Sequence, residues 1–250
     1  MRAALGDRDA KVLRRMSLPV DAKSNSTFVK QLEALILKVG GSDLSSIEGI
    51  GIGAAGRLDI RKGTLVYSPH TSLRDVKLKL LEDRLGKPVS LLNDAVAAAL
   101  AERNIGAGRG CDNLVYVGIG TGIGGGAVVD GRLLIGKDGN AHEMGHMIVD
   151  IAGKLECSCG GRGHWEAYTS GSGIPNFAQL LAKTYGGETP CLKQVKSQRI
   201  EAKAVFDYAR RGDGFAKFVL DECSKVNAMA FANLVDLYDP SMISVGGGVA

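Results

Sequence analysis

Residues 143–166 read EMGHMIVDIAGKLECSCGGRGHWE. Within this stretch Cys157 and Cys159 lie between His146 and His164, and the four side chains supply the number and type of ligands of a closed tetrahedral zinc site. The glycines that precede His164 allow the backbone to curl, so that ligands five residues apart reach one ion. The alternative is a pair of small buried cysteines beside a packed histidine. The spacing favours zinc, although Cys-x-Cys is less specific than paired Cys-x-x-Cys motifs.

Two carboxylates, Glu143 and Glu166, flank the outer ligands of this stretch. A structural metal ion would pin the loop that carries them. We therefore predict a substrate site that is built on a metal-stapled loop.

Bulk composition restricts the class of protein. The chain has 250 residues, 45% of them hydrophobic and 23% charged, which suits one or two globular domains. The net charge is +4, but the basic residues are scattered rather than gathered in one stripe, so we expect no nucleic-acid partner. No apolar run of 18 residues and no signal peptide is present, so we expect no membrane association. Five cysteines, two of them in the metal motif, indicate a reduced, cytoplasmic protein.

Glycine is over-represented, with 35 residues, about twice the usual share. The glycines cluster in 49–56, 118–126 and 246–248, and each cluster follows or interrupts an apolar β-branched run. The pattern predicts three glycine turns at strand ends, where the backbone can approach a ligand closely.

The hydrophobic pattern alternates between strands and helices, which predicts an α/β protein. We expect a first α/β domain over 1–108, ending near the glycines of 106–110, and a second over 109–250. The expected strands are 1–5, 12–18, 47–52, 89–92, 114–117, 127–129, 133–135 and 242–245. The expected helices are 27–38, with Ser26 and Thr27 as caps, 76–85, 95–103, 177–184, 202–211 and 215–237.

Asn93 and Asp94 stand where an expected strand ends and an Ala-rich helix begins. Ligands of open α/β sheets bind at this end of the strands. The alternative is that these side chains only cap the helix. Both interpretations hold if Asn93 caps the helix and Asp94 faces a cleft.

The segment 120–125 matches the pattern Gly-x-Gly-x-x-Gly. A dinucleotide-binding fingerprint requires a helix after this pattern. Here a hairpin follows, because Asp130-Gly131 between apolar runs is a strong turn signal, and we reject that interpretation. Successive backbone N–H groups and the hydroxyl of Thr121 can instead bind phosphates. An ordinary tight turn is the alternative, and the density of glycine favours phosphate binding.

Taken together, five motifs resemble those of the ROK family (repressors, open reading frames and sugar kinases), most strongly its glucokinase-type members. In chain order they are Leu92–Ala95, Gly120–Gly126, Ala141–His146, Cys157–Glu166 and Gly246–Ala250. The resemblance implies an actin/hexokinase-like (ribonuclease H-like) α/β fold, with two domains and a central cleft where ATP and sugar meet. It also implies an ATP-dependent sugar kinase of carbohydrate metabolism.

The resemblance also implies a role for each motif. Asp94 would be the general base on the sugar hydroxyl, and His146 would bind zinc through one ring nitrogen and face the sugar with the other. The implied cofactors are ATP, magnesium and a structural zinc, and we expect a homo-oligomer, either a dimer or a tetramer. The implied sugar contacts are Gly56, Asn93, Asp94, Glu143, His146 and Glu166. The implied ATP contacts are Thr121, Gly122, Gly124, Gly125, Gly126, Gly247 and Gly248.

The chain departs from the family pattern in three places. His164 stands where the family usually has cysteine, which makes the metal set Cys2His2, and His142 replaces a usual glycine and would reshape the sugar pocket. Family members begin with a strand and an Asp-x-Gly-x-Thr turn ahead of residues 1–5, and they continue beyond 248. We expect this chain to be clipped at both ends and, as given, to be a poor kinase.

Two functions remain open. The first is an ATP-dependent hexose kinase, with glucose favoured, and the second is a ROK-type sugar-binding or regulatory module without kinase activity. Asp94 and Thr121 favour the kinase, whereas the expected clipping favours the module. A purely structural zinc module would leave Asn93-Asp94 and 120–126 unexplained. The preferred sugar stays open, because different hexoses would contact many of the same groups.

Overall fold

The computed structural model describes residues 1–68, 71, 73–197 and 200–250. The chain forms two compact units. Unit 1 comprises Met1–Ala97 and Ile135–Ala141, and unit 2 comprises Ala98–Leu134 and His142–Ala250. The chain therefore passes from one unit to the other three times, and the domain limits drawn from the sequence stay a prediction.

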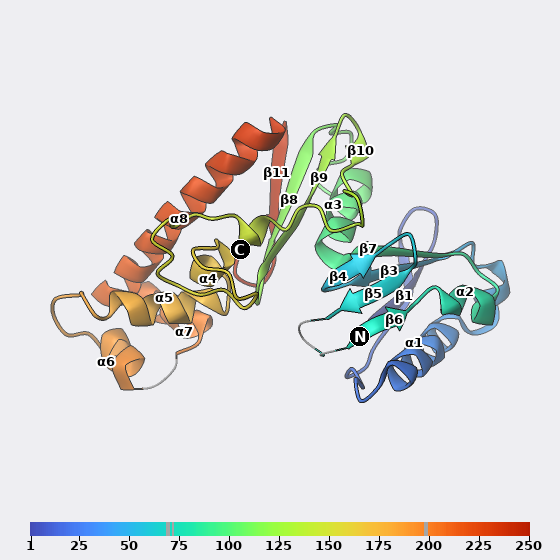
Figure 1. The fold of residues 1–250 in the computed structure, drawn as a ribbon, viewed down its shortest axis with the longest axis horizontal. Helices are drawn as coiled ribbons and strands as arrows, with labels where there is room; N and C mark the ends of the chain where they lie inside the picture. Colours follow the sequence, from blue (N-terminus) through green and yellow to red (C-terminus); the bar gives the residue numbers. More distant parts are fainter. Residues whose placement is uncertain (69–70, 72, 198–199) are drawn as a thin grey trace. The chain divides into compact units, whose positions relative to one another are not determined.

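The described residues of unit 1 form three small sheets, two complete α-helices and the start of a third. The antiparallel pair β1 and β2 and the parallel pair β3 and β7 match expected strands, whereas the antiparallel sheet β4-β5-β6 was not expected. The elements are β1 (Arg2–Gly6), β2 (Val12–Ser17), α1 (Asn25–Gly40), η1 (Gly41–Ser46), β3 (Ile50–Ala54), β4 (Arg57–Asp59), β5 (Thr64–Tyr67), β6 (Arg74–Lys77), α2 (Leu80–Leu85) and β7 (Val89–Asn93). Figure 1 labels most of these elements.

Two expectations for unit 1 were wrong in detail. The cap of α1 is Ser24, whose side chain accepts a hydrogen bond from the Thr27 N–H, rather than Ser26 or Thr27. The helix expected over 76–85 is divided into the end of β6 and the short α2, because Val76 pairs with Leu65 of β5. Tertiary strand pairing overrides a helical hydrophobic period here.

A large apolar cavity, about 1060 Å³ in volume, lies within unit 1. It is lined by β1 and β3 and by apolar side chains of α1, including Phe28, Leu32 and Ile36. Among the described residues, β1 pairs only with β2, and β3 pairs only with β7. Each of these two strands therefore has one edge without a partner strand, and the apolar face of α1 is only partly covered.

Unit 2 contains a four-stranded sheet in the order β10-β9-β8-β11. Its strands are β8 (Leu114–Ile119), β9 (Ile123–Val129), β10 (Arg132–Leu133) and β11 (Met242–Gly246). β8 and β9 form an antiparallel hairpin, so no helix follows the glycine-rich turn, and β11 is parallel to β8. Asp130 and Gly131 join β9 to β10 with φ angles of 49° and 70°, as the tight Asp-Gly turn predicts.

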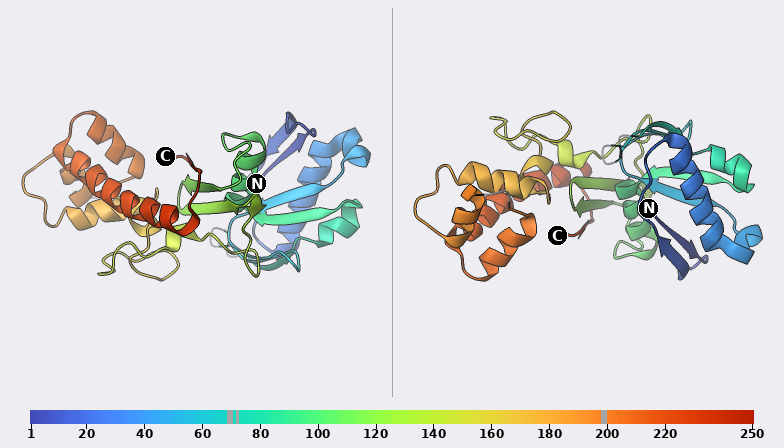
Figure 2. Two further views of the ribbon diagram at one scale, coloured as in Figure 1. Left: turned by 90° about the horizontal axis from the view of Figure 1, so that it is seen from above. Right: turned by 90° about the horizontal axis from the view of Figure 1, so that it is seen from below.

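Helices complete unit 2 and bury its core. They are α3 (Asp94–Ile105, which begins in unit 1), η2 (Met144–His146), α4 (Glu166–Thr169), α5 (Gly173–Leu181), α6 (Pro190–Ser197), α7 (Ala202–Arg210) and α8 (Gly214–Tyr238). Asp213 caps α8 by accepting a hydrogen bond from the Ala216 N–H at 2.9 Å. The left view of Figure 2 shows α8, in red, along its length. Among the described helices, none is long and apolar enough to cross a membrane.

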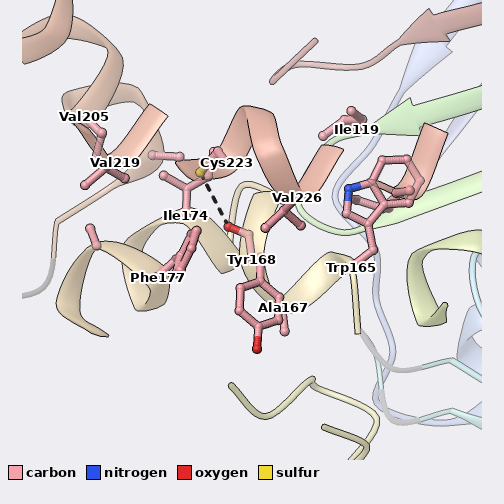
Figure 3. Close-up of a cluster of buried hydrophobic side chains, with 14 of the residues drawn as sticks. Ile119, Trp165, Ala167, Tyr168, Ile174, Phe177, Val205, Val219, Cys223 and Val226 are labelled. Carbon is pink, nitrogen blue, oxygen red and sulfur yellow. Dashed lines mark hydrogen bonds between the residues drawn. The ribbon is translucent and has the colours of Figure 1, made fainter. Parts of the chain in front are cut away.

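Trp165 and Tyr168 anchor α4 in this core, as Figure 3 shows. The Trp165 indole is fully buried, and its Nε1–H donates to Asn227 Oδ1 of α8 at 2.8 Å. The Cys223 thiol donates a long hydrogen bond to the Tyr168 carbonyl. Cys223 and Cys191 are both buried in this core, and burial raises the pKa of each thiol to about 12.

Candidate metal centre and ligand sites

Four side chains converge at one end of unit 2 and form the metal centre predicted from the sequence. One ligand atom each from His146, Cys157, Cys159 and His164 lies within 4.8 Å of the other three. The two histidine Nδ1 atoms are 3.3 Å apart, Cys157 Sγ is 3.6 Å from His146 Nδ1, and Cys159 Sγ is 3.3 Å from His164 Nδ1. Ligands of a tetrahedral zinc ion lie about 3.3 to 3.8 Å apart, given its usual Zn–N and Zn–S distances. The donor set and its spacing therefore fit zinc.

Backbone hydrogen bonds hold the loop that carries these ligands, which we call the metal loop (147–165). The Trp165 N–H donates to the Met147 carbonyl at 2.9 Å, which returns the end of the loop to its start. The Cys157 N–H donates to Gly161 O at 2.8 Å and closes the turn between the cysteines and His164. The Tyr168 hydroxyl donates to Asp150 at 2.5 Å and fixes the loop to α4. The loop therefore has a defined path that presents Cys157, Cys159 and His164 beside His146, which precedes it in η2.

Burial acts in opposite directions on two of the ligands, because a metal binds the thiolate of cysteine and the neutral imidazole of histidine. Burial raises the pKa of the Cys157 thiol to about 11, and the neighbouring Glu166 charge acts in the same direction. Burial also lowers the pKa of His164, with a further contribution from His146, which favours the neutral imidazole that a metal requires. A zinc ion would displace the Cys157 proton on binding.

The two ring nitrogens of His146 have different neighbours. Its Nδ1 lies in the ligand cluster, whereas its Nε2 is 3.7 Å from Glu143 Oε2. Glu143 is exposed to solvent at the start of η2. The structure thus brings together the metal ligand and the carboxylate that the resemblance assigns to sugar, although the sugar contacts themselves stay a prediction.

Glu166 connects the metal loop to the glycine-rich turn. Its Oε2 accepts a hydrogen bond from the Ile123 N–H at 2.8 Å, while Oε1 accepts one from the Ser158 hydroxyl at 3.2 Å and lies 3.5 Å from Cys157 Sγ. A Cβ on Gly122 would lie 2.2 Å from Glu166 Oε2, so a side chain at this point of the turn would displace the carboxylate. The sequence analysis assigned Glu166 to sugar alone and missed this contact, which joins residues 43 positions apart.

The turn between β8 and β9 lines a pocket of about 570 Å³. Gly120 and Thr121 of the turn line it together with Gly248, which follows β11; Thr121 and Gly248 are among the predicted ATP contacts, which stay a prediction. The Ser172 N–H and hydroxyl both donate to the Thr121 carbonyl, at 3.1 and 2.8 Å, and fix the turn against the start of α5. The pocket residues that sequence reasoning did not identify are Gly171, Ser172, Pro175, Ile200, Glu201, Ala202, Lys203 and Val249.

The other predicted nucleotide residues lie outside this pocket lining. Gly124, Gly125 and Gly126 are inside β9 and pair with Gly118, Val117 and Tyr116 of β8. Gly247 packs against the backbone of Ile119, where a Cβ would lie 2.2 Å from the carbonyl oxygen. These glycines support the strands behind the turn, and their contacts with ATP stay a prediction.

In unit 1, Asn93 and Asp94 occupy the junction of β7 and α3. Asn93 Oδ1 accepts hydrogen bonds from the N–H groups of Ala95 and Val96, at 2.9 and 3.4 Å, so the capping interpretation is confirmed for this side chain. Asp94 is exposed, and its Oδ1 accepts a hydrogen bond from the Ala95 N–H at 3.0 Å. Gly56, after β3, has a φ of 119°, which favours glycine.

His142 occupies an unusual position at the start of the second segment of unit 2. Its φ is 71°, its Nε2 contacts the Leu134 carbonyl, and its Nδ1 is buried without a partner in the described part of the chain. Burial lowers the pKa of His142. The imidazole is therefore neutral, with Nε2–H as the donor to Leu134.

Comparison with known proteins agrees with the motifs. The sequence profile of the ROK family matches residues 1–250. The glucokinase of Aeropyrum pernix is 40% identical over 214 residues, which cover 84% of this chain and 67% of that enzyme.

A crystal structure of a ROK family glucokinase from Streptomyces griseus, in complex with glucose and AMPPNP, superposes with a TM-score of 0.78 and 34% identity, covering 99% of this chain and 80% of that one. A ROK family transcriptional regulator, a homologue of the E. coli MLC protein, superposes with a TM-score of 0.83 and 28% identity over 98% of this chain and 62% of its own. These superpositions confirm the predicted actin/hexokinase-like α/β fold.

Proposed function

The chain belongs to the ROK family, and we propose that it catalyses the ATP-dependent phosphorylation of a hexose, with glucose favoured. The observation that carries this proposal is the pocket of unit 2. It joins the glycine turn at Gly120 and Thr121 to Gly248, two segments that the family resemblance assigns to ATP. The glucose and AMPPNP bound by the Streptomyces griseus glucokinase support both substrates.

The pocket has the chemistry of a nucleotide site. The helices α5 and α7 begin beside it, at Ser172–Gly173 and Glu201–Ala202, and helix N-termini favour negatively charged groups such as phosphates. Val249 is half-buried and offers apolar surface suited to a nucleoside base, and Ile200 lies in the core beneath the pocket. We assign the phosphates to the turn at Gly120–Thr121 and the nucleoside to the apolar part.

Asp94 is the proposed general base. Phosphoryl transfer depends on positioning and on neutralisation of charge, and the protein activates the attacking hydroxyl with a carboxylate. The exposed Asp94 carboxylate would accept the proton of the sugar hydroxyl as it attacks the γ-phosphate, while Asn93 keeps the start of α3 in place. Magnesium bound with ATP would neutralise charge on its phosphates.

The metal centre is the proposed site of a structural zinc ion, held by His146, Cys157, Cys159 and His164. Zinc would supply a fixed point for the metal loop and no chemistry of its own. It would hold His146 by Nδ1 and leave Nε2 directed to Glu143 and, with it, to the sugar hydroxyls.

The test is a coupled kinase assay with zinc-loaded protein, ATP and magnesium over a panel of glucose, mannose, N-acetylglucosamine and N-acetylmannosamine. We expect glucose to have the highest kcat/KM. Turnover of none of these sugars, with zinc present at one per chain, would reject the kinase.

A regulatory, sugar-binding role is the second candidate, and the superposition on the ROK transcriptional regulator favours it. Calorimetry separates the two functions. A kinase binds both sugar and AMPPNP, whereas a regulatory module binds sugar and leaves AMPPNP unbound.

A further inference from the structure

We propose that Glu166 couples the metal centre to the nucleotide turn, so that zinc binding strengthens nucleotide binding and nucleotide strengthens zinc binding. This inference rests on the proposed function, because it assigns the pocket at Gly120 and Thr121 to a nucleotide. It adds a positioning role for Glu166 that is separate from any contact with sugar.

The first half of the connection joins Glu166 to the metal loop. Oε1 of Glu166 accepts a hydrogen bond from the Ser158 hydroxyl at 3.2 Å and lies 3.5 Å from Cys157 Sγ. Ser158 stands between the two cysteine ligands, so its position depends directly on whether Cys157 and Cys159 are held on one ion. Glu166 itself is the first residue of α4, next to Trp165, which is fully buried. The backbone that carries the Glu166 carboxylate is therefore held firmly by the core.

The second half joins the same carboxylate to the turn. Oε2 accepts the Ile123 N–H at 2.8 Å, and the Gly122 Cα is so close that a Cβ would lie 2.2 Å from this oxygen. The carbonyl of Gly122 accepts a hydrogen bond from the Gly120 N–H at 2.9 Å, which ties the contacted half of the turn to the half that lines the pocket. One carboxylate thus bridges two segments that the chain separates by 43 residues.

This geometry makes the two binding events interdependent. When zinc orders Cys157 and Ser158, Oε1 of Glu166 keeps its partner, and Oε2 stays directed at the Ile123 N–H. Without zinc, the loop segment around Ser158 loses its anchor and the carboxylate gains freedom to leave the turn. A coupling free energy between two sites is reciprocal and corresponds to roughly 5- to 150-fold in affinity.

The experiment compares the Kd of AMPPNP for zinc-loaded and chelator-treated protein, measured by calorimetry. For the parent we expect AMPPNP to bind about 5- to 150-fold more weakly after zinc removal. For Glu166→Ala we expect the zinc-loaded form to bind as weakly as the zinc-free parent, with no further loss on chelation. Glu166→Gln keeps one acceptor oxygen and should fall between the two.

Glu156→Ala is the matched control. Glu156 is an exposed glutamate of the metal loop, and its carboxylate pairs with Arg162 of the same loop at 3.3 Å. This variant should keep the full zinc dependence of the parent. Zinc content and circular dichroism of each variant exclude unfolding as the cause of a change.

Amide hydrogen exchange gives a readout that does not depend on nucleotide. Zinc removal should accelerate exchange of peptides that contain Ile123 in the parent and in Glu156→Ala, whereas in Glu166→Ala exchange should be fast with and without zinc. Equal AMPPNP affinity for the zinc-loaded and zinc-free parent would overturn the coupling, and so would a Glu166→Ala protein that keeps the parent's zinc dependence. Failure of the zinc-loaded parent to bind AMPPNP would instead reject the proposed function, and the exchange data would still decide whether Glu166 connects loop and turn.

Discussion

The two units of the protein support their functional residues in different ways. In unit 2, the strand β8 that leads to the glycine turn is buried on both sides, with Leu114, Val115 and Val117 fully inaccessible, and its sheet has four strands. In the described part of unit 1, the strand β7 that leads to Asn93 and Asp94 pairs with β3 alone, and a cavity of about 1060 Å³ lies in the same unit.

Because of this difference, the proposed functional residues of the two units differ in how firmly the surrounding structure holds them. The metal centre and the pocket rest on a continuous core, reinforced by side-chain contacts such as those of Glu166. Asp94 rests on two hydrogen-bonded strands and on the Asn93 cap. We therefore expect substitutions around the metal centre to act on stability as well as on function, and substitution of Asp94 to act on catalysis alone.

Removal of the metal should have the largest effect. We expect one zinc per chain, and structural zinc sites contribute on the order of 10 kcal/mol to folding. Cys157→Ser should lose the zinc and lower the unfolding temperature, because it removes a buried ligand. Metal analysis of tag-free protein and thermal unfolding with and without chelator measure both effects. Cys111→Ser, outside the ligand cluster, should keep its zinc, and a parent with well under one zinc per chain would contradict the prediction.

Substitution of Asp94 in unit 1 should change catalysis without changing stability. Asp94→Asn should lower kcat by about 10²- to 10⁴-fold, the usual contribution of general-base catalysis. Sugar binding and the unfolding temperature should stay close to those of the parent, because asparagine preserves the shape and Asn93 still caps α3. Steady-state kinetics and calorimetry provide the measurements. Turnover within a few-fold of the parent would remove Asp94 from the role of base.

A pair of leucines compares the two cores directly. Leu234 of α8 is fully buried in unit 2, and Leu234→Ala should cost about 2–5 kcal/mol of unfolding free energy. Leu32 of α1 is only half-buried and lines the cavity, so Leu32→Ala leaves less new empty space and should cost less than about 2 kcal/mol. Urea unfolding of both variants measures the difference. Equal losses would show that α1 is as well covered as α8.

The smallest expected effect is a pH dependence at His142. Burial lowers the pKa of His142 below 6.5, so as the pH falls below 6.5 the unfolded chain takes up a proton that the folded protein resists. Stability should decline from pH 6.5 down to the lowered folded pKa and change no further below it. The ring that faces His142 belongs to Tyr238, whose pKa is raised by burial, so it stays neutral over this range.

His142→Asn tests this pH dependence, because asparagine tolerates the φ of 71° and does not titrate. The comparison is made on zinc-loaded protein, in which the metal would hold His146 and His164. The parent should lose more stability than the variant between pH 6.5 and 5. Identical pH profiles would show that the His142 imidazole accepts a proton freely in the folded state.

Local patterns were the reliable part of the sequence. The four metal ligands fall within 19 residues and are separated by glycines, so the ligand set could be predicted without knowledge of the fold. The β9–β10 hairpin at the Asp130-Gly131 turn and the long helix α8 were predicted for the same reason, because turn residues and hydrophobic periods act over a few positions. Where a local period competed with strand pairing, as at Val76, the sequence analysis was wrong.

Contacts between distant segments could not be predicted from spacing. The sequence contains Glu166 and Gly122, but only the folded chain shows that the carboxylate occupies the space that a Cβ at Gly122 would need. Similarly, the pocket adds Glu201 and Lys203 to the glycine turn because α7 begins beside it. Residue types and short spacings therefore determined the chemistry available to this protein. The tertiary structure decided which of those groups meet, because chain paths of 40 to more than 100 residues are set by packing and strand pairing rather than by local preference.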